Sequence, residues 1–466
     1  MTEDLPGGRL LRIIVGVRDR DSLRRAVPMV RRIFVVLRPR SGEPMDQSGQ
    51  SESDRGQEPV SHGTNHQATD ADWSRFRRQM PVAERWAYFD HAAVAPLPAP
   101  AVGAIRLWVE SASCNGVTEW SQWQESLSAV RQLASEWLNV SSREIALVRN
   151  TTEGIGLIAE GFPWEAGDNV VTLASEFPSN LYPWQNLASR GVETRLVPTD
   201  LEQVDLNRLE SACDERTRLV SVSCVGYATG FWLGLTQVDV IAHRRVARLF
   251  VDAIQGAGVW PLDLQRVPVD FLAFDGHKWM LGPEGAGVLF IREEQLTRLR
   301  PLNVGWNSVK TAGDFSQQGV RLKDSAARYE GGTMPVPGFV GLAASWRLLQ
   351  EYGVERLSSR LKQVTDQLVE RLNRETPACV VSCRQSPHFS GIVSCDVPGG
   401  CSQRLREYCR ERQVVVNCRG GRLRLSPHVY TNLADIDRIV EILRDFPFQR
   451  RRDSDHDNKS GCSGCS

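Results

Sequence analysis

Short apolar runs that alternate with longer amphipathic stretches constrain the fold of this chain more than any other feature. Six runs rich in Val, Ile, Leu and Phe fit buried strands, at 145–149, 169–173, 219–224, 249–252, 271–274 and 287–291. Runs that are apolar throughout suit strands covered on both faces, and the segments between them are long enough for crossover helices. The sequence therefore predicts an α/β fold with a mostly parallel central sheet in a large domain.

Changes in composition predict the domain boundaries. Residues 41–72 are polar and nearly free of aliphatic side chains, so they cannot offset the entropy lost on ordering. After Gly338 a long amphipathic stretch leads into shorter strands. We predict an N-terminal extension with little order (1–72), a segment that packs with the small domain (73–95), the large domain (96–337), a smaller α+β C-terminal domain (338–448) and a disordered tail (449–466).

The charge balance argues against nucleic-acid and membrane partners, and the cysteine content bears on the cellular compartment. Lys plus Arg and Asp plus Glu both number 56, so no net field attracts nucleic acid or an anionic membrane. No apolar run approaches the roughly 20 residues of a membrane-spanning helix. The eleven cysteines have no framework spacing, which favours reduced thiols in a cytoplasmic protein and no structural disulfides. Cys462 and Cys465 form a C-x-x-C without a second ligand pair, so we expect no metal.

One lysine follows a predicted strand directly. The segment FLAFDGHKWMLGP places Lys278 just after the run 271–274. An amine at the mouth of a sheet is desolvated, which lowers its pKa and makes it a nucleophile toward an aldehyde. Taken alone, a surface lysine would be the commoner interpretation. The neighbouring motifs favour the interpretation of Lys278 as a reactive lysine.

A carboxylate follows another predicted strand. Asp252 ends the run 249–252, and Gln255 lies in the turn after it. The protonated pyridine nitrogen of pyridoxal phosphate (PLP) is a cationic partner for such an acid. Gln255 could donate a hydrogen bond to the ring 3-hydroxyl or hold Asp252. A capping role at the strand end is the alternative for Asp252.

A phosphate site is predicted where a helix begins. Thr151 and Thr152 lie between the strand 145–149 and a helical pattern. Backbone N–H groups at a helix start, with hydroxyls beside them, bind phosphate. A capping box from Asn150 to Glu153 uses the same residues and remains an alternative.

In their order and spacing these motifs resemble the class V aminotransferase family, from about Tyr88 to Phe446. That family includes cysteine desulfurases, selenocysteine lyases and isopenicillin N epimerases. The resemblance implies the PLP-dependent transferase fold of aspartate aminotransferase. It further implies that PLP forms a Schiff base with Lys278, that an amino-acid substrate reacts through an external aldimine, and that the protein is a homodimer with shared active sites.

The resemblance also implies roles for five further residues. Phe177 in Ser-Glu-Phe-Pro-Ser-Asn would stack on the cofactor ring, and Tyr227 would contact its 3-hydroxyl. His277 would contact the phosphate, and Thr333 in Glu-Gly-Gly-Thr would reach the neighbouring subunit's phosphate. Arg424 in RGGRLRLSPHVYTN would bind the substrate carboxylate through two parallel hydrogen bonds. The competing choices for that role are Arg419 and Arg422.

Two departures from the family pattern bear on the reaction. Asp275 stands where relatives have a small or hydroxylated residue, and an acid is a poor neighbour for a phosphate dianion. The segment 414–424 is too short for the loop that carries the nucleophilic cysteine of desulfurases, and Cys418 is interpreted as a buried strand residue. The leading expectation is an elimination like that of selenocysteine lyases or cysteine desulfurases. The alternatives are an amino-acid epimerase and a non-catalytic binding protein.

Overall fold

The central element is a seven-stranded sheet in a computed structural model that describes residues 69–316 and 318–448. β10 is antiparallel to both of its neighbours, and the five strands from β9 to β4 are mutually parallel. All six predicted runs form strands, and the prediction of a mostly parallel sheet is confirmed. The strand order is β2 (Ile145–Val148), β10 (Gly287–Ile291), β9 (Phe271–Asp275), β8 (Arg248–Asp252), β7 (Thr217–Ser223), β3 (Asn169–Leu173) and β4 (Glu193–Val197).

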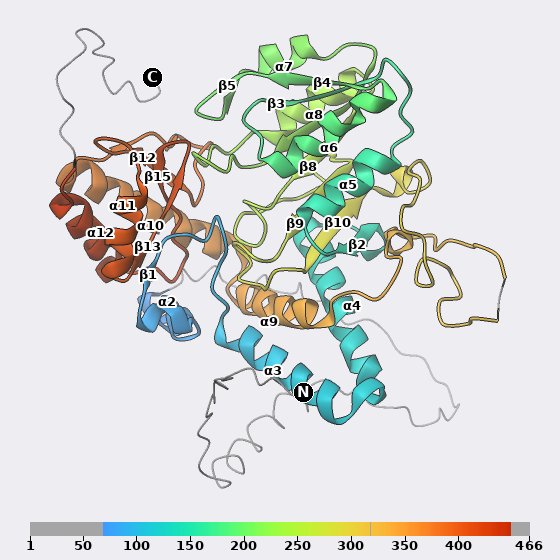
Figure 1. Cartoon of the computed structure of the whole chain (residues 1–466), viewed down its shortest axis with the longest axis horizontal. Helices are drawn as coiled ribbons and strands as arrows, with labels where there is room; N and C mark the ends of the chain where they lie inside the picture. Colours follow the sequence, from blue (N-terminus) through green and yellow to red (C-terminus); the bar gives the residue numbers. More distant parts are fainter. Residues whose placement is uncertain (1–68, 317, 449–466) are drawn as a thin grey trace, which may run out of the picture. The chain divides into compact units, whose positions relative to one another are not determined.

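Helices cover both faces of this sheet (Figure 1). Within β8, Leu249 and Val251 belong to one apolar cluster and Phe250 to another, because successive strand side chains point to opposite faces. α5 packs on β9 and β10 on one face, and α8 packs on β8. The helices are α3 (Ala99–Cys114), α4 (Trp120–Leu138), α5 (Thr151–Gly161), α6 (Tyr182–Gln185), α7 (Leu206–Ala212), α8 (Leu235–Arg244) and α9 (Val336–Tyr352).

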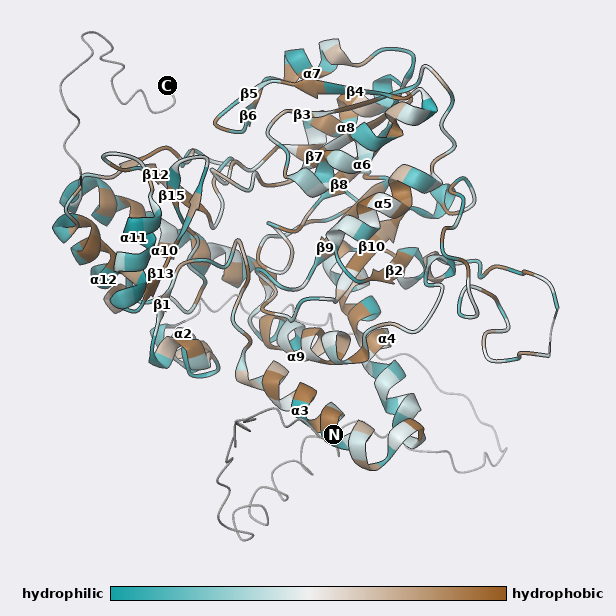
Figure 2. Cartoon of the chain, viewed as in Figure 1, coloured by the Kyte–Doolittle hydropathy of each residue, from teal (hydrophilic) through white to brown (hydrophobic). Residues whose placement is uncertain are grey.

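A second, four-stranded sheet follows in the chain. Its order is β11 (Cys379–Val380), β12 (Val393–Asp396), β15 (Arg422–Leu425) and β14 (Asn417–Arg419), all antiparallel. Three amphipathic helices accompany it, with hydrophobic and hydrophilic residues on different sides (Figure 2): α10 (Val354–Glu375), α11 (Gln403–Glu411) and α12 (Leu433–Asp445).

The remaining short elements connect or extend these parts. α2 (Asp70–Arg78) is capped by Thr69, and β5 (Thr199–Asp200) pairs with β6 (Gln203–Val204). β1 (Ala87–Tyr88) pairs in parallel with β13 (Val414–Val415), so the N-terminal segment is tied to the C-terminal part of the chain. Within residues 69–316 and 318–448, no helix has the length and apolar character needed to cross a bilayer. The predictions for residues 1–68 and 449–466, including Cys462 and Cys465, fall outside the described residues. The predicted extension with little order reached residue 72, but residues 70–72 begin α2, which Thr69 caps.

The expectation of no structural disulfides is wrong. Cys401 and Cys418 form a disulfide across a Cα–Cα distance of 5.7 Å, a separation that suits the bond. The N–H of Cys401 donates to the carbonyl of Gly421, just beyond β14, and this contact brings the two cysteines together. Their 17-residue separation in sequence gave no sign of the pairing.

Candidate active site

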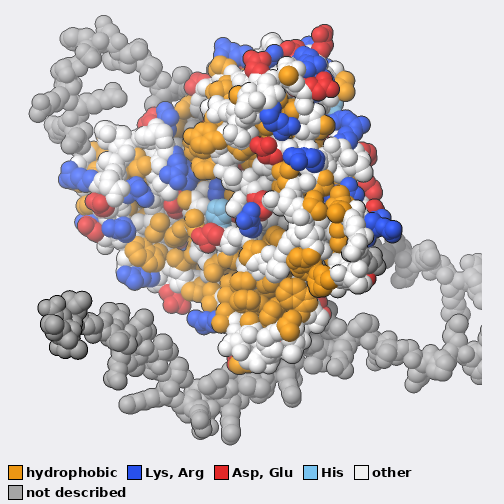
Figure 3. All heavy atoms as spheres, turned by 45° about the vertical axis from the view of Figure 1, so that its right-hand side comes forward, with side chains coloured by type: hydrophobic (Ala, Val, Ile, Leu, Met, Phe, Trp, Pro, Cys, Tyr) orange, Lys and Arg blue, Asp and Glu red, His pale blue; other side chains and the backbone are white. Residues whose placement is uncertain are grey.

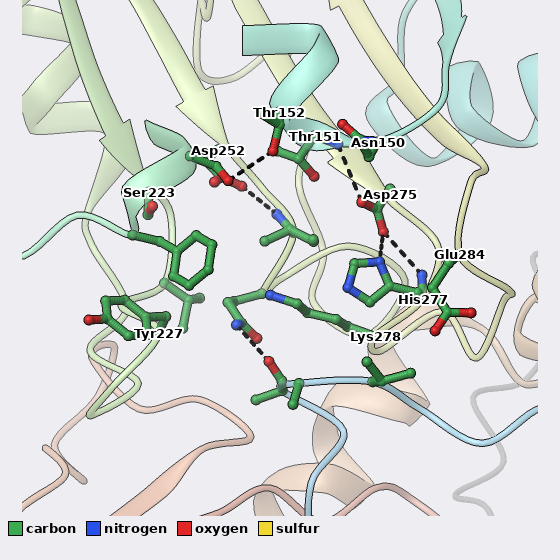
Figure 4. A pocket seen from close by; sticks show the side chains of 18 of the residues that line it. Asn150, Thr151, Thr152, Ser223, Tyr227, Asp252, Asp275, His277, Lys278 and Glu284 are labelled. Carbon is green, nitrogen blue, oxygen red and sulfur yellow. Dashed lines mark hydrogen bonds and ion pairs between the residues drawn. The ribbon is translucent and has the colours of Figure 1, made fainter. Parts of the chain in front are cut away.

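Polar side chains converge where the strands of the large sheet end. Ser223, Asp252 and Asp275 are the last residues of β7, β8 and β9, and Thr151 opens α5 directly after β2. They line a cavity of about 500 Å³ together with Lys278 (Figure 4). Ligands of open α/β sheets bind outside the carboxyl ends of the strands, so the position of this cavity is the expected one.

Lys278 is buried and lines the cavity. Its side chain lies three residues after β9, and its ammonium nitrogen is 5.8 Å from the ring centroid of Phe177. Burial lowers the pKa of Lys278 to about 8, against the opposing charges of Asp252 and Asp275. About a tenth of the amine is therefore unprotonated at pH 7, far more than in an ordinary lysine, and this unprotonated form is the nucleophile toward an aldehyde.

Asp252 is a buried acid on the neighbouring strand. Its Oδ1 accepts a hydrogen bond of 3.0 Å from the N–H of Ile254. Burial raises the pKa of Asp252 to about 6, although that hydrogen bond and the charge of Lys278 act in the opposite direction. The cavity leaves room for a cationic partner beside this acid. Asp252 also accepts from the N–H of Ile254, so the alternative role as a cap at the strand end is present as well.

The start of α5 offers donors to an anion. Asn150 caps the helix by accepting from the N–H of Glu153 at 2.8 Å. Among the described residues, the buried hydroxyl of Thr151 finds no hydrogen-bond partner. The hydroxyl of Thr152 instead donates to the Ser179 hydroxyl over 2.8 Å. The unpartnered Thr151 hydroxyl and the helix N-terminus together fit a phosphate group.

Asp275 occupies part of this same region. Its Oδ2 accepts the N–H of Thr151 at 3.3 Å, and its Oδ1 accepts both the N–H and Nδ1 of His277 (Figure 4). Asp275 is therefore turned toward the start of α5 and not away from it. His277 lines the cavity with its Nδ1 held by the carboxylate, and its contact with a phosphate stays a prediction.

Phe177 and Tyr227 form one wall of the cavity. Their rings meet edge to face with centroids 5.2 Å apart. Phe177 is 41% exposed, although it is a large apolar residue. Phe177 therefore lines the cavity with part of its ring uncovered, and its stacking on a cofactor ring stays a prediction.

Gln255 lines the cavity but is engaged by the protein. Its Nε2 donates to the carbonyl of Ala92 at 3.1 Å, and its Oε1 accepts from the indole of Trp279 at 2.9 Å. The side chain therefore ties the N-terminal segment to the lysine-bearing loop, and Ile254 is the residue that donates to Asp252.

Of the three competing arginines, two reach the cavity. Arg424 is almost fully buried, donates to the carbonyl of Tyr227 at 2.7 Å and pairs with Asp90 at 3.2 Å. Its buried Nε has no partner among the described residues. Arg419 also lines the cavity, whereas Arg422 pairs with Asp396 elsewhere on the small sheet.

Thr333 lies apart from this group. It is exposed, and it is not one of the described residues that line the cavity. Glu330, at the start of the same motif, is buried against Arg131 at 2.8 Å. A role for Thr333 in the same chain's cavity is thus not supported, and its predicted role in a second subunit stays a prediction.

Two polar neighbours of the site were missed from the sequence. Ser223 lines the cavity opposite Asp252, and its N–H and hydroxyl both donate to Glu176 at 2.7 and 2.5 Å. Burial raises the pKa of Glu176 to about 7, against these hydrogen bonds. The available signal was the position of Ser223 at the end of a predicted strand, where Asp252 also lies.

The described lining of the cavity contains no cysteine. Cys418 is held in the disulfide with Cys401, and Cys224 is buried beside the site with its pKa raised by burial. Over residues 69–316 and 318–448, no three His, Cys, Asp or Glu side chains gather as metal ligands.

Comparison with known proteins gives one consistent family. The family model "Aminotransferase class-V" matches residues 87–439. A protein named "probable cysteine desulfurase" from Methanothermobacter thermautotrophicus is 31% identical over 392 residues, covering 79% of this chain and 96% of its own. A cysteine desulfurase from Escherichia coli K12 is 31% identical over 302 residues, covering 61% of this chain and 73% of its own.

Solved structures agree with this result. A mutant of C-DES with glycine covalently linked to its PLP cofactor is 27% identical with a TM-score of 0.75, covering 79% of this chain and 99% of its own. The complex of the cystine C–S lyase C-DES with its reaction product cysteine persulfide is 28% identical with a TM-score of 0.74, covering 79% of this chain and 100% of its own. The predicted PLP-dependent transferase fold is confirmed. The chain belongs to the class V aminotransferase family of PLP-dependent enzymes.

Proposed function

We propose that this enzyme cleaves the bond between Cβ and sulfur or selenium in a cysteine-type amino acid. The observation that carries the proposal is the buried pair of Lys278 and Asp252 in a cavity whose described lining holds no cysteine. The relatives named as cysteine desulfurases and a cystine C–S lyase support the substrate class.

The residues of the cavity fit PLP. Lys278 would hold the cofactor covalently, Asp252 would pair with its ring nitrogen and Phe177 would cover its ring. Thr151, with its unpartnered hydroxyl, and His277 would contact the phosphate. When bound, PLP supplies an electron sink next to the substrate's Cα.

The protein's own groups would orient the substrate and move one proton. The guanidinium of Arg424 would bind the substrate carboxylate, because a charge-assisted pair fixes the orientation of the amino acid. The amine of Lys278, with a pKa lowered to about 8, would take the proton from Cα as a general base. Phe177, which would cover the other face of the cofactor ring, carries no ionisable group, and this disfavours an epimerase that uses two bases.

The sulfur atom would leave the active site in a product derived from the substrate and would not be transferred to a cysteine of the enzyme. A persulfide relay needs an enzyme thiolate beside the substrate, and the described lining of the cavity offers none. Elimination from cysteine then consumes one water and yields hydrogen sulfide, pyruvate and ammonia. Elimination from cystine likewise consumes one water and yields cysteine persulfide, pyruvate and ammonia.

Product analysis tests this proposal. The full chain with PLP is supplied with cysteine, cystine or selenocysteine, beside Lys278→Ala as the control. We expect pyruvate and the reduced sulfur or selenium product in equal amounts, and loss of both in the control. Exchange of the Cα proton with inversion and without pyruvate would instead indicate an epimerase. No reaction with any amino acid, despite bound PLP, would favour a binding protein.

We further propose that the enzyme is a homodimer with shared active sites. Several apolar side chains in the part of the chain before Thr333 are exposed, among them Trp306 (43%), Phe315 (81%) and Val320 (69%). Figure 3 shows apolar side chains gathered in a broad area on one face of the molecule. Large exposed apolar areas mark interaction surfaces.

Sedimentation tests whether the protein is a dimer, and loss of PLP affinity in Thr333→Val tests whether the active site is shared. A monomer that retains full activity would contradict it.

We also propose a cytoplasmic location. The proposal rests on the spacing of the eleven cysteines, which follows no disulfide framework. The disulfide between Cys401 and Cys418 counts against it, because a reducing compartment disfavours such bonds. Cell fractionation tests it, and recovery of the protein outside the cytoplasm would contradict it.

A further inference from the structure

Asp275 places a carboxylate inside the region that fits the cofactor phosphate. It is 3% exposed and lines the cavity, and its Oδ2 accepts the N–H of Thr151 at the first residue of α5 (Figure 4). That N–H is one of the few free donors that a helix start offers an anion. The Thr151 hydroxyl beside it is buried and finds no partner among the described residues. The carboxylate and a phosphate would therefore compete for the same end of the helix.

The charges around Asp275 only partly offset its own. His277 contacts it from the loop after β9, and Lys278 lies within electrostatic range in the same loop. Asp252 on β8 adds a second negative charge within range, and Glu284 lines the same cavity. Arg419 and Arg424 also line the cavity, so its lining as a whole carries no excess of acids. A phosphate dianion at the start of α5 would nevertheless meet the carboxylate of Asp275 directly, and like charges disfavour one another at short range in a buried site.

We infer that Asp275 limits the affinity of this enzyme for PLP by competing with the cofactor phosphate for the start of α5. The inference rests on the proposed role of PLP and adds a specific determinant to it. The carboxylate either yields the N–H of Thr151 when the phosphate binds or keeps it and weakens the contact. In both cases the phosphate contributes less to the binding of PLP than it would at a helix start without a competing carboxylate.

The comparison of PLP with pyridoxal isolates this effect, because the two molecules differ only in the phosphate. Dissociation constants are measured by equilibrium dialysis on the full chain stripped of cofactor. Asp275→Asn keeps the shape of the side chain and removes its charge, and Asp275→Ala removes the acceptor as well. We expect both variants to bind PLP at least tenfold more tightly than the original protein, with pyridoxal affinity changed less than threefold.

Glu284→Gln is the matched control, because it removes a negative charge from the same cavity without freeing the N–H of Thr151. We expect its PLP affinity to change less than threefold. Unchanged or weaker PLP binding in both Asp275 variants would overturn the inference, and so would an equal gain for pyridoxal. If PLP binds to neither the original protein nor any variant, the cofactor role itself fails, and this result is distinguishable from the others.

Discussion

The guanidinium of Arg424 pairs with the carboxylate of Asp90 over 3.2 Å, although 334 positions separate them in the sequence. Asn417 donates to the same carboxylate at 2.7 Å. The pair therefore joins the N-terminal segment to the small sheet at the edge of the cavity. Since an arginine so buried requires a partner, Asp90 holds Arg424 in place and leaves its unpartnered Nε for another acceptor.

Arg424→Lys tests the carboxylate-binding role. A lysine keeps the charge near Asp90 but loses the planar fork, so the substrate's carboxylate is held less well. We expect KM to rise at least tenfold with a smaller change in kcat. Arg422→Lys on the same strand is the control, because Arg422 pairs with Asp396 outside the cavity and its loss should leave KM unchanged. Equal effects from both variants would contradict the assignment.

Asp252→Asn should stabilise the cofactor-free protein. The folded pKa of about 6 lies above the usual value of 3.8, so ionised Asp252 destabilises the fold. The penalty is absent below about pH 4, grows as the pH rises and is complete above about pH 6. We expect the variant to be more stable at pH 8 by about 1–3 kcal/mol, with little difference at pH 4. Urea unfolding at both pH values measures this, and a variant less stable at pH 8 would argue against it.

The same substitution should impair the enzyme that carries PLP. An amide is a weaker partner than a carboxylate for the protonated ring nitrogen, so the electron sink weakens. We expect kcat to fall at least 100-fold. Full activity in Asp252→Asn would exclude the proposed contact between Asp252 and the ring.

The pH dependence of cofactor uptake follows from the pKa of Lys278. Only the unprotonated amine attacks the aldehyde, and burial lowers its pKa to about 8. The rate of PLP uptake by the stripped protein should therefore rise with pH up to about 8 and level off above it. Stopped-flow absorbance measures this rate. A continued rise to pH 10 would indicate an ordinary exposed lysine.

Removal of the disulfide should destabilise the fold without changing the chemistry. The double variant Cys401→Ser/Cys418→Ser frees a loop of 17 residues in the unfolded chain, which corresponds to about 3 kcal/mol. Dithiothreitol should lower the melting temperature of the original protein and leave that of the double variant unchanged. Cys114→Ser, at an exposed thiol, is the control. Insensitivity of the original protein to dithiothreitol would show that the bond does not form.

The elements that carry the fold could be predicted because their signals are local. Six of the seven strands of the large sheet are continuous apolar runs, which reflects helices on both faces. β4 was missed because it lies at the edge of the sheet, where Glu193 is exposed and Thr194 and Arg195 are only partly buried. The disulfide was missed because its two cysteines meet only through the loop beside β14.

Residues of the candidate site could be predicted from the sequence where a reactive or charged side chain follows a predicted strand. Lys278, Asp252 and Thr151 follow strands, so their convergence came from the α/β pattern itself. The orientation of Asp275 depended on its contacts with Thr151 and His277, which no pattern in the sequence specifies. Glu176 acts through Ser223, and such an indirect contact has no signal in the sequence.

The visible absorbance of the purified protein with PLP, beside Lys278→Ala, tests the central claim most directly. We predict a yellow band in the original protein that is altered in Lys278→Ala and that shifts when cysteine or cystine is added. A band that is identical in Lys278→Ala would contradict the role of this lysine. The absence of any band in the original protein would contradict the account of the site as a whole.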